Sequence, residues 1–111
     1  MKMGYTNYWE QVRDFSQVEW DNVEADCAYL QDLGYDCEIE TTGADTKVFR
    51  LYGECETFSL HKKRRTKEEY EGQNLSFYFC KTRMKPYDLA VKYMLGQVAQ
   101  NLGEDFTYWS D

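Results

Sequence analysis

The chain has 111 residues, with 42% hydrophobic side chains, 17% aromatic side chains and a formal net charge of −7. This length corresponds to one domain, and the apolar content is sufficient for a core without disulfides or metal ions. No run of 18 apolar residues is present, and the N-terminus lacks the apolar stretch of a signal peptide. We therefore expect a single cytoplasmic domain that spans 1–111 and has no membrane partner.

Basic residues are concentrated in one short segment. The segment 62–67 holds five of the 13 basic side chains, so the rest of the chain has 8 basic against 20 acidic side chains, a net charge of −12. An acidic surface repels the phosphate backbone, which argues against stable binding of nucleic acid. Acidic residues within 68–71 follow the basic run, a pattern typical of a solvated loop. We predict a mobile charged loop over 61–74, with contact of its basic run to nucleic acid as the alternative.

Four cysteines and one histidine give little support for a metal site. No Cys-x-x-Cys pair is present, and a single histidine does not complete a common zinc set. The even number of cysteines would also allow two disulfides, but without a secretion signal we favour free and mostly buried thiols. We expect no metal ion and no cofactor. The residues are Cys27, Cys37, Cys55, Cys80 and His61.

The first two expected elements are a strand over 4–9 and a helix over 17–33. The strand prediction follows from the aromatic and β-branched residues of Gly-Tyr-Thr-Asn-Tyr-Trp. Ser16 suits the N-cap of the helix, Glu19 completes a capping box, and Gly34 suits the position after the last turn. Apolar residues recur at helical spacing between these ends. They are Trp20, Val23, Cys27 and Leu30.

Three strands are expected next, over 37–41, 48–52 and 55–60. The first shows the alternation of a half-buried strand. A short glycine-containing link joins the second to the third, which indicates a hairpin. In the third strand, Phe58 and Leu60 share one face.

The last third of the chain predicts a strand over 75–80, a helix that starts at Pro86 and a short edge strand over 106–109. Proline suits the first position of a helix, and Gly103 suits its end. The elements together predict an α+β fold, in which a small, mainly antiparallel sheet of about five strands, in the order β-α-β-β-β-β-α, packs against two helices. One face of the strand carries Leu75, Phe77 and Phe79, and the apolar stripe of the helix comprises Val91, Leu95, Val98 and Leu102.

The passage from the strand 75–80 to the following helix is the best candidate for a ligand site. A helix start presents free backbone N–H groups and a partial positive charge, both of which attract anions. The approach adds three cations; arginine can hold a phosphate through two parallel hydrogen bonds, whereas lysine acts as a point charge. Pairing with acidic neighbours or simple solvation is the alternative. The candidate ligand-binding residues here are Lys81, Thr82, Arg83, Lys85, Tyr87 and Asp88.

Aromatic residues of the first strand form a second candidate. Alternation places Tyr5 and Trp9 on one face and Tyr8 with Thr6 on the other. An aromatic ring that stacks on a nucleobase contributes roughly 1–3 kcal/mol per base. Aromatic residues in strands also build cores, and this alternative stays open.

A later strand offers a carboxylate and a hydroxyl, at Glu56 and Thr57, that could bind base or ribose groups. Solvent-facing side chains are the alternative. Catalytic patterns are weak, because His61 has no adjacent nucleophile and the chain has no glycine-rich phosphate loop and no paired-carboxylate motif. We therefore assign no catalytic residue and lean towards a protein that is not an enzyme.

Two segments resemble a family of short proteins encoded in phage and prophage genomes. One is the opening Gly4-Tyr5-Thr6-Asn7-Tyr8-Trp9. The other is Phe79-Cys80-Lys81-Thr82-Arg83-Met84-Lys85-Pro86-Tyr87-Asp88-Leu89-Ala90-Val91, with Glu56-Thr57-Phe58 between the two. The family typically has histidine where this chain has Asn7. The resemblance implies a phage origin and a location in the cytoplasm of an infected bacterial host.

These features favour a phage-encoded protein that sequesters a small anionic nucleotide and so inhibits nucleotide-based antiviral immunity of the host. The hypothesis requires the first strand to lie beside the strand 75–80. Pockets often form between subunits in proteins of this size, so we also expect a homo-oligomer. The alternative is an acidic inhibitor of a host nucleic-acid-binding defence complex, and a small nucleotide hydrolase is less favoured. The acidic face of that alternative would comprise Glu38, Glu40, Glu54 and Glu56.

Overall fold

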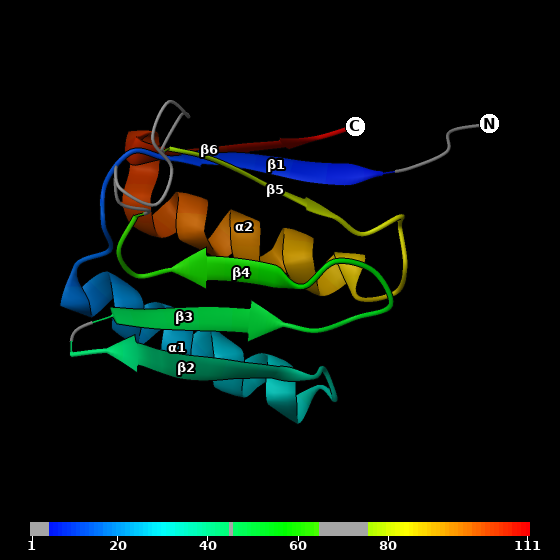
Figure 1. Ribbon diagram of the computed structural model, residues 1–111, viewed down its shortest axis with the longest axis horizontal. Helices are drawn as coiled ribbons and strands as arrows, with labels where there is room; N and C mark the ends of the chain where they lie inside the picture. The colour runs from blue at the N-terminus through cyan, green and yellow to red at the C-terminus, as the bar shows by residue number, and fades with distance from the viewer. Residues whose placement is uncertain (1–4, 45, 65–75) are drawn as a thin grey trace.

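The computed structural model describes residues 5–44, 46–64 and 76–111 (Figure 1). Within these residues, two α-helices and six strands form an α+β fold, which confirms the predicted class. A short 3-10 turn, η1, joins the second helix to the last strand. The elements are β1 (Thr6–Gln11), α1 (Gln17–Asp32), β2 (Cys37–Gly43), β3 (Thr46–Leu51), β4 (Phe58–His61), β5 (Phe77–Lys81), α2 (Asp88–Leu102), η1 (Gly103–Asp105) and β6 (Phe106–Ser110).

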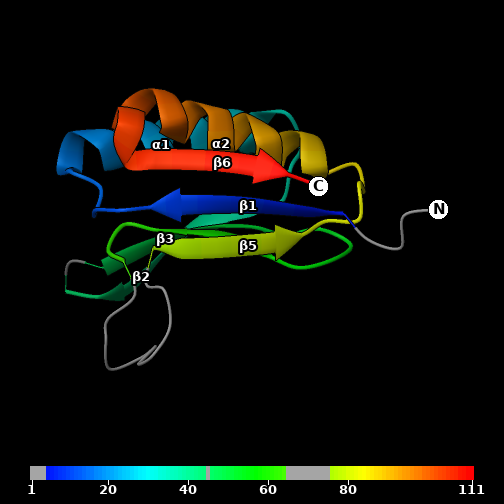
Figure 2. The ribbon, with the colours of Figure 1, turned by 90° about the horizontal axis from the view of Figure 1, so that it is seen from above.

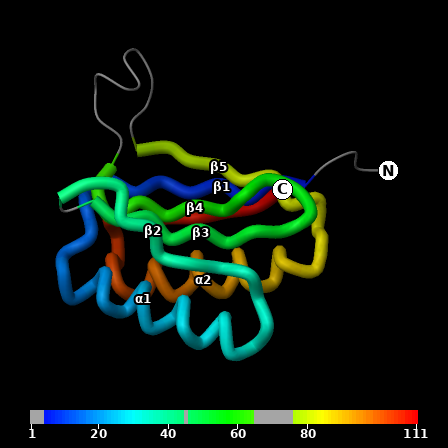
Figure 3. Tube along the Cα trace, turned by 60° about the horizontal axis from the view of Figure 1, so that its bottom comes forward, coloured from blue at the N-terminus to red at the C-terminus, as the bar shows by residue number. Residues whose placement is uncertain are grey.

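The described strands form two antiparallel sheets of three strands each, in the orders β5-β1-β6 and β2-β3-β4. We call β5-β1-β6 the upper sheet. Both helices lie on the same side of the strands (Figure 3). The sheet β2-β3-β4 stands in front of the helices, and the upper sheet lies across their upper edge (Figures 1 and 2).

The strands were expected in one sheet, and the end of β5 gives the reason for the division. β4 begins at Phe58 rather than at Cys55, and the residues before it cross the end of β5. There the N–H of Glu56 donates to the carbonyl of Lys81 at 3.1 Å, and the N–H of Lys81 donates to Glu56 Oε1 at 2.6 Å. A side chain thus takes the place of a backbone acceptor, so the pairing stops at β5.

The helix α1 begins where the sequence predicts. Ser16 Oγ accepts the N–H of Glu19 at 3.2 Å, and the Glu19 carboxylate accepts the N–H of Ser16 at 2.8 Å, which completes the capping box. Gly34 follows the last turn with a φ of 96°, a left-handed conformation that glycine adopts without strain. The predicted apolar stripe is buried, at Trp20, Val23, Cys27 and Leu30.

The helix α2 begins at Asp88 rather than at Pro86. The N–H of Asp88 donates to the carbonyl of Lys85 at 2.8 Å, and that of Leu89 donates to the carbonyl of Pro86 at 3.3 Å. These bonds span three residues, so they belong to a tight turn before the regular helix. The predicted apolar stripe is buried, at Val91, Leu95, Val98 and Leu102.

The upper sheet buries one face against the core. Trp9 is 2% exposed, and its ring centroid lies 5.0 Å from that of Phe58 and 5.8 Å from that of Tyr78. In β5 the buried side chains are Tyr78 and Cys80, whereas Phe79 is 58% exposed. The apolar face that we predicted for this strand is therefore its outer face.

The basic run begins within the folded chain. His61 is the last residue of β4, and Lys62 is buried with its Nζ donating to Gln17 Oε1 at 2.7 Å. The Arg64 guanidinium donates to the carbonyl of Val12 at 2.6 Å. These contacts tie the residues after β4 to the start of α1 and to the segment between β1 and α1. The rest of the predicted mobile loop lies outside the described residues.

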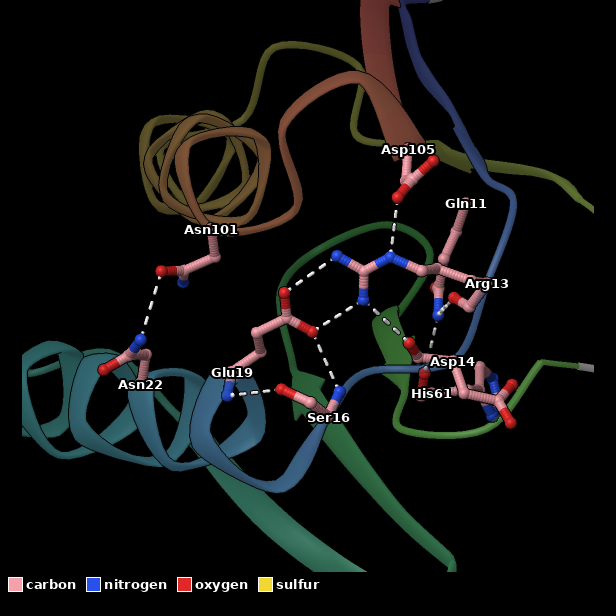
Figure 4. A network of polar contacts seen from close by, with 9 residues as sticks. All are labelled: Gln11, Arg13, Asp14, Ser16, Glu19, Asn22, His61, Asn101 and Asp105. Carbon is pink, nitrogen blue, oxygen red and sulfur yellow. Dashed lines mark hydrogen bonds and ion pairs between the residues drawn. The ribbon is translucent and has the colours of Figure 1, made fainter.

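A polar network joins the end of β1 to the first turn of α1 and to η1 (Figure 4). The Arg13 guanidinium donates to both carboxylate oxygens of Glu19, at 2.7 and 2.8 Å, and to Asp105 Oδ2 at 2.7 Å. These hydrogen bonds from Arg13 lower the pKa of Glu19 to about 2. Gln11 Nε2 donates to the carbonyls of Arg13 and His61, at 3.0 and 3.3 Å. The network therefore ties the end of β1 to the end of β4, to α1 and to η1.

The four cysteines are free thiols. The Sγ atoms of Cys27 and Cys37 lie 3.8 Å apart in the core, and burial raises the pKa of Cys27 to about 12. Of the two helices in the described residues, neither has the length and apolar character needed to cross a membrane.

Candidate functional site

The basic segment after β5 forms a tight turn with an unusual backbone. Residues 82–85 are closed by a hydrogen bond from the N–H of Lys85 to the carbonyl of Thr82 at 3.1 Å. The central residues Arg83 and Met84 have φ of 53° and 56°, a left-handed conformation that costs about 1 kcal/mol or more per residue with a side chain. The N–H groups of Thr82 and Arg83 donate to the carbonyl of Tyr5, at 3.0 and 3.1 Å. The segment before β1 therefore holds the turn, whose central side chains are exposed.

The start of α2 offers few free donors to a ligand. The N–H groups of Asp88, Leu89 and Ala90 each donate to a carbonyl three residues earlier. The Asp88 carboxylate, in a residue only 6% exposed, accepts Thr82 Oγ1 at 2.6 Å and Asn7 Nδ2 at 2.7 Å. A carboxylate of the chain thus lies near the helix start, where the sequence suggested an external anion. An anion at this corner would contact the exposed cations of the turn instead.

A cation and a phenol complete the network around Asp88. Lys92 lies one helical turn later and donates to Asp88 Oδ2 at 3.0 Å. Its Nζ also donates to the hydroxyl of Tyr5 and lies 4.2 Å from the centre of that ring. Burial alone would raise the pKa of Asp88, but hydrogen bonds from Thr82, Asn7 and Lys92 outweigh burial and lower it. Asp88 is therefore charged at neutral pH and ties together β1, the turn and α2.

The outer face of the upper sheet, onto which Figure 2 looks, carries exposed aromatic residues in register. Tyr8 of β1 lies opposite Phe79 of β5 and opposite Trp109 of β6. We call these three residues the aromatic row. The rings of Tyr8 and Trp109 are nearly parallel with centroids 5.7 Å apart, and Trp109 is 44% exposed. Lys81 shares this face, two residues after Phe79, and pairs with Thr6 in the register.

The structure brings part of the two predicted clusters together. Tyr8 and Lys81 lie on adjacent strands and on one face, so β1 has the position that the nucleotide hypothesis requires. Trp9 faces the core, and Tyr87 packs so closely on Gly53 that a Cβ there would lie 2.3 Å from its ring. The buried members of the predicted set are Thr6, Trp9, Thr82, Tyr87 and Asp88; Tyr5 and Tyr8 are half-buried; Glu56, Thr57, Lys81, Arg83 and Lys85 are exposed.

Four residues of this corner were not selected as site residues from the sequence. Phe79 was missed because both faces of its strand carry large side chains, and the open choice between stacking and core kept Trp109 out of the set. The spacing of Asp88 and Lys92 is a usable signal, since residues four apart meet on a helix surface. Asn7 gave no such signal, because its contact with Asp88 joins positions 81 apart.

The acidic residues proposed as a binding face are largely paired within the chain. The hydroxyl of Tyr52 donates to Glu38, and Arg50 donates to Glu40 at 3.3 Å. The Glu56 carboxylate accepts a backbone N–H at the end of β5. Three of the four carboxylates thus accept a hydrogen bond within the chain, and Glu40 is also neutralised by the Arg50 guanidinium, whereas the donors to Glu38 and Glu56 are neutral and leave their charge in place.

In the part of the chain that the structure describes, no group of three or more His, Cys, Asp or Glu side chains is placed to hold a metal ion. Comparisons with family models, curated proteins and solved structures found no match to this chain.

Proposed function

We propose that the protein binds a small anionic nucleotide on the outer face of the upper sheet. The proposal is carried by the pairing of β1 with β5, which sets the aromatic row beside Lys81 and the turn 82–85. Lys81 follows Phe79 by about 7 Å along the strand, a separation comparable to that between the base and the phosphate of a nucleotide.

Each part of the site would contact a different part of the ligand. The exposed rings of Phe79 and Trp109 offer stacking surface, at roughly 1–3 kcal/mol per base. The exposed side chains of Lys81, Arg83 and Lys85 would pair with phosphate oxygens. The left-handed backbone of Arg83 adds support, because strain of this kind clusters at ligand sites.

Binding without turnover gives the protein a sequestering role. Such a protein lowers the free concentration of its ligand in proportion to its own abundance. Together with the phage origin that the resemblance implies, this role would suit a nucleotide signal of host immunity as the ligand.

Isothermal titration calorimetry with linear and cyclic nucleotides tests the proposal. Phe79→Ala and Arg83→Ala should each weaken binding roughly tenfold, through lost stacking and lost charge respectively. Tyr29→Ala and Lys47→Ala are matched controls, an exposed aromatic on α1 and a half-exposed cation on β3, and should leave the affinity unchanged.

Two results would count against the proposal. Absence of binding heat and of any thermal shift with every nucleotide rejects it, and binding that survives both Phe79→Ala and Arg83→Ala removes the ligand from this face. Chromatography of the recovered nucleotide then distinguishes sequestration, which leaves it intact, from hydrolysis.

A further inference from the structure

The outer face of the upper sheet is apolar at its centre and charged at two corners. Phe79, Tyr8 and Trp109 form the central row, with Lys81 beyond Phe79 on β5 and Asp111 beyond Trp109 after β6. Contiguous exposed aromatic residues with a charged rim are typical of protein interfaces. We propose that a second copy of this chain docks on this face and forms a dimer with two-fold symmetry.

The positions of the two charges select the symmetry axis. Lys81 and Asp111 lie at the same end of the sheet, on opposite sides of Thr6. Thr6 is paired with Lys81 on β5, and its carbonyl accepts the N–H of Asp111 at 3.1 Å. A two-fold axis parallel to β1 and passing over Tyr8 exchanges β5 of one copy with β6 of the other. Lys81 then faces Asp111 of the second copy, and Phe79 faces its Trp109. Each contact occurs twice, as an isologous interface requires.

An axis perpendicular to the strands lacks this complementarity. It would place Lys81 over Phe77 and Asp111 over Thr107, because it reverses the strand direction without exchanging β5 and β6. Charges covered without partners are costly, so the parallel axis is favoured. The angle of about 30° usual between packed sheets shifts the corners only slightly, and the flexible lysine side chain can follow.

The chain itself fixes Asp111 on this face. Its Oδ1 accepts the hydroxyl of Tyr8 at 3.1 Å, and its Oδ2 accepts the N–H of Thr6 at 2.9 Å. A carboxylate has about four acceptor sites, so two remain for a lysine. A side chain that is already placed loses less entropy on association. The proposed axis also passes over Glu10, so the Glu10 carboxylates of the two copies face each other, and their repulsion weakens the dimer.

The size of the face sets the strength of the dimer. Three strands about 4.8 Å apart and five residues at about 3.4 Å give roughly 250 Å² for each copy. A standard interface buries about 800 Å² per partner, so we expect a reversible dimer of micromolar or weaker affinity. The dimer contacts involve Phe79, Trp109 and Lys81, which the proposed function assigns to the nucleotide, so a nucleotide and a second copy would compete for this face. The dimer does not depend on the proposed function.

Sedimentation velocity without nucleotide, from low micromolar to near-millimolar protein, tests the dimer. The unmodified chain should shift from monomer to dimer as its concentration rises. Lys81→Glu and Asp111→Lys each replace attraction with repulsion and should weaken the dimer roughly tenfold or more. The combined variant should recover the dimer. Glu10→Gln should strengthen it.

Controls separate the cross-copy pair from other effects. Asp111→Lys also removes hydrogen bonds within the chain, but the combined variant shares this loss. The difference in dimer affinity between these two variants therefore reports the pair of residues 81 and 111 across the two copies. Glu54→Lys, at an exposed position outside the upper sheet, should leave the dimer unchanged, and urea unfolding verifies that each variant folds. A monomer at every concentration, or a combined variant no tighter than the single variants, overturns the proposal. Nucleotide titration of the monomer would still decide the proposed function.

Discussion

Replacing Asp88 with asparagine tests the network that holds the turn against β1 and α2. Asp88 accepts hydrogen bonds from Thr82 at 2.6 Å and from Asn7 at 2.7 Å, and it pairs with Lys92 at 3.0 Å. Asparagine keeps the shape and one acceptor oxygen, but it loses the charge and can direct an N–H donor at the lysine. The variant therefore weakens all three interactions without removing volume.

The expected loss follows from these contacts. Hydrogen bonds to a charged group contribute about 1.5–3 kcal/mol and neutral ones about 0.5–1.5 kcal/mol, so each of the two short bonds loses about 1 kcal/mol. The Lys92 side chain is 37% exposed, so solvent screens its ion pair, which adds at most about 0.5 kcal/mol. Asp88→Asn should lower the free energy of unfolding by about 2–3 kcal/mol, a fall in Tm of roughly 10–20 °C for a domain of this size.

Urea unfolding followed by circular dichroism at neutral pH measures this loss, with an unchanged m-value as the sign of two-state behaviour. Asp21→Asn is the matched control, because Asp21 is exposed and accepts a single hydrogen bond from Gln17 at 2.8 Å. Its effect should stay within about 0.5 kcal/mol. An Asp88→Asn loss no larger than that of the control would refute the reasoning.

The pH dependence gives the same prediction a second readout. Hydrogen bonding lowers the pKa of Asp88 in the folded protein, so its stabilisation is present above the unfolded pKa and is lost as pH falls through the folded pKa. The stability advantage of the unmodified chain over Asp88→Asn should therefore shrink below about pH 4. An advantage that stays constant into strong acid contradicts the assignment.

Three further predictions concern other parts of the fold. Hydrogen bonds from Arg13 lower the pKa of Glu19 to about 2, so the stabilisation from Glu19 is lost as pH falls from about 4.5 towards 2. Urea titrations should show that Glu19→Gln flattens the dependence of the unfolding free energy on pH over that range. An unchanged dependence on pH contradicts this prediction. Met84→Gly should raise Tm through relief of about 1 kcal/mol of left-handed strain, whereas Met84→Ala, which keeps a Cβ, should give no gain. The half-buried Cys55 should react with a thiol reagent before Cys27, whose burial raises its pKa to about 12, and equal rates measured by mass spectrometry would contradict this order.

The helices and the fold class could be predicted because their signals are local. The capping box needs only Ser16 and Glu19, and each apolar stripe repeats within a single segment. The error at the start of α2 is also local. Proline suits the first turn of a helix, but it equally suits the second residue of a β-turn. Pro86 is the second residue of the turn 85–88, which precedes α2.

The division of the strands into two sheets could not be predicted in this way. β1 pairs with β5 and β6, which follow it by most of the length of the chain, and no feature of its six residues names these partners. The faces of β5 were equally ambiguous, because Tyr78 and Phe79 are both large and apolar enough to be buried. Packing against Trp9 decides for Tyr78, and only a long-range contact carries that information.

Long-range contacts also change what the basic segment can recognise. Three cations before a helix start suggest a pocket in which backbone N–H groups hold an anion, yet the N–H groups of Thr82 and Arg83 donate to the carbonyl of Tyr5. Within the aromatic row, the hydroxyl of Tyr8 already donates to Asp111. The groups left for a ligand are the charges of Lys81, Arg83 and Lys85 and the surfaces of the rings. Stacking tolerates every base, so the proposed site, if it binds nucleotides, should discriminate them by the number and placement of their phosphates more than by their bases.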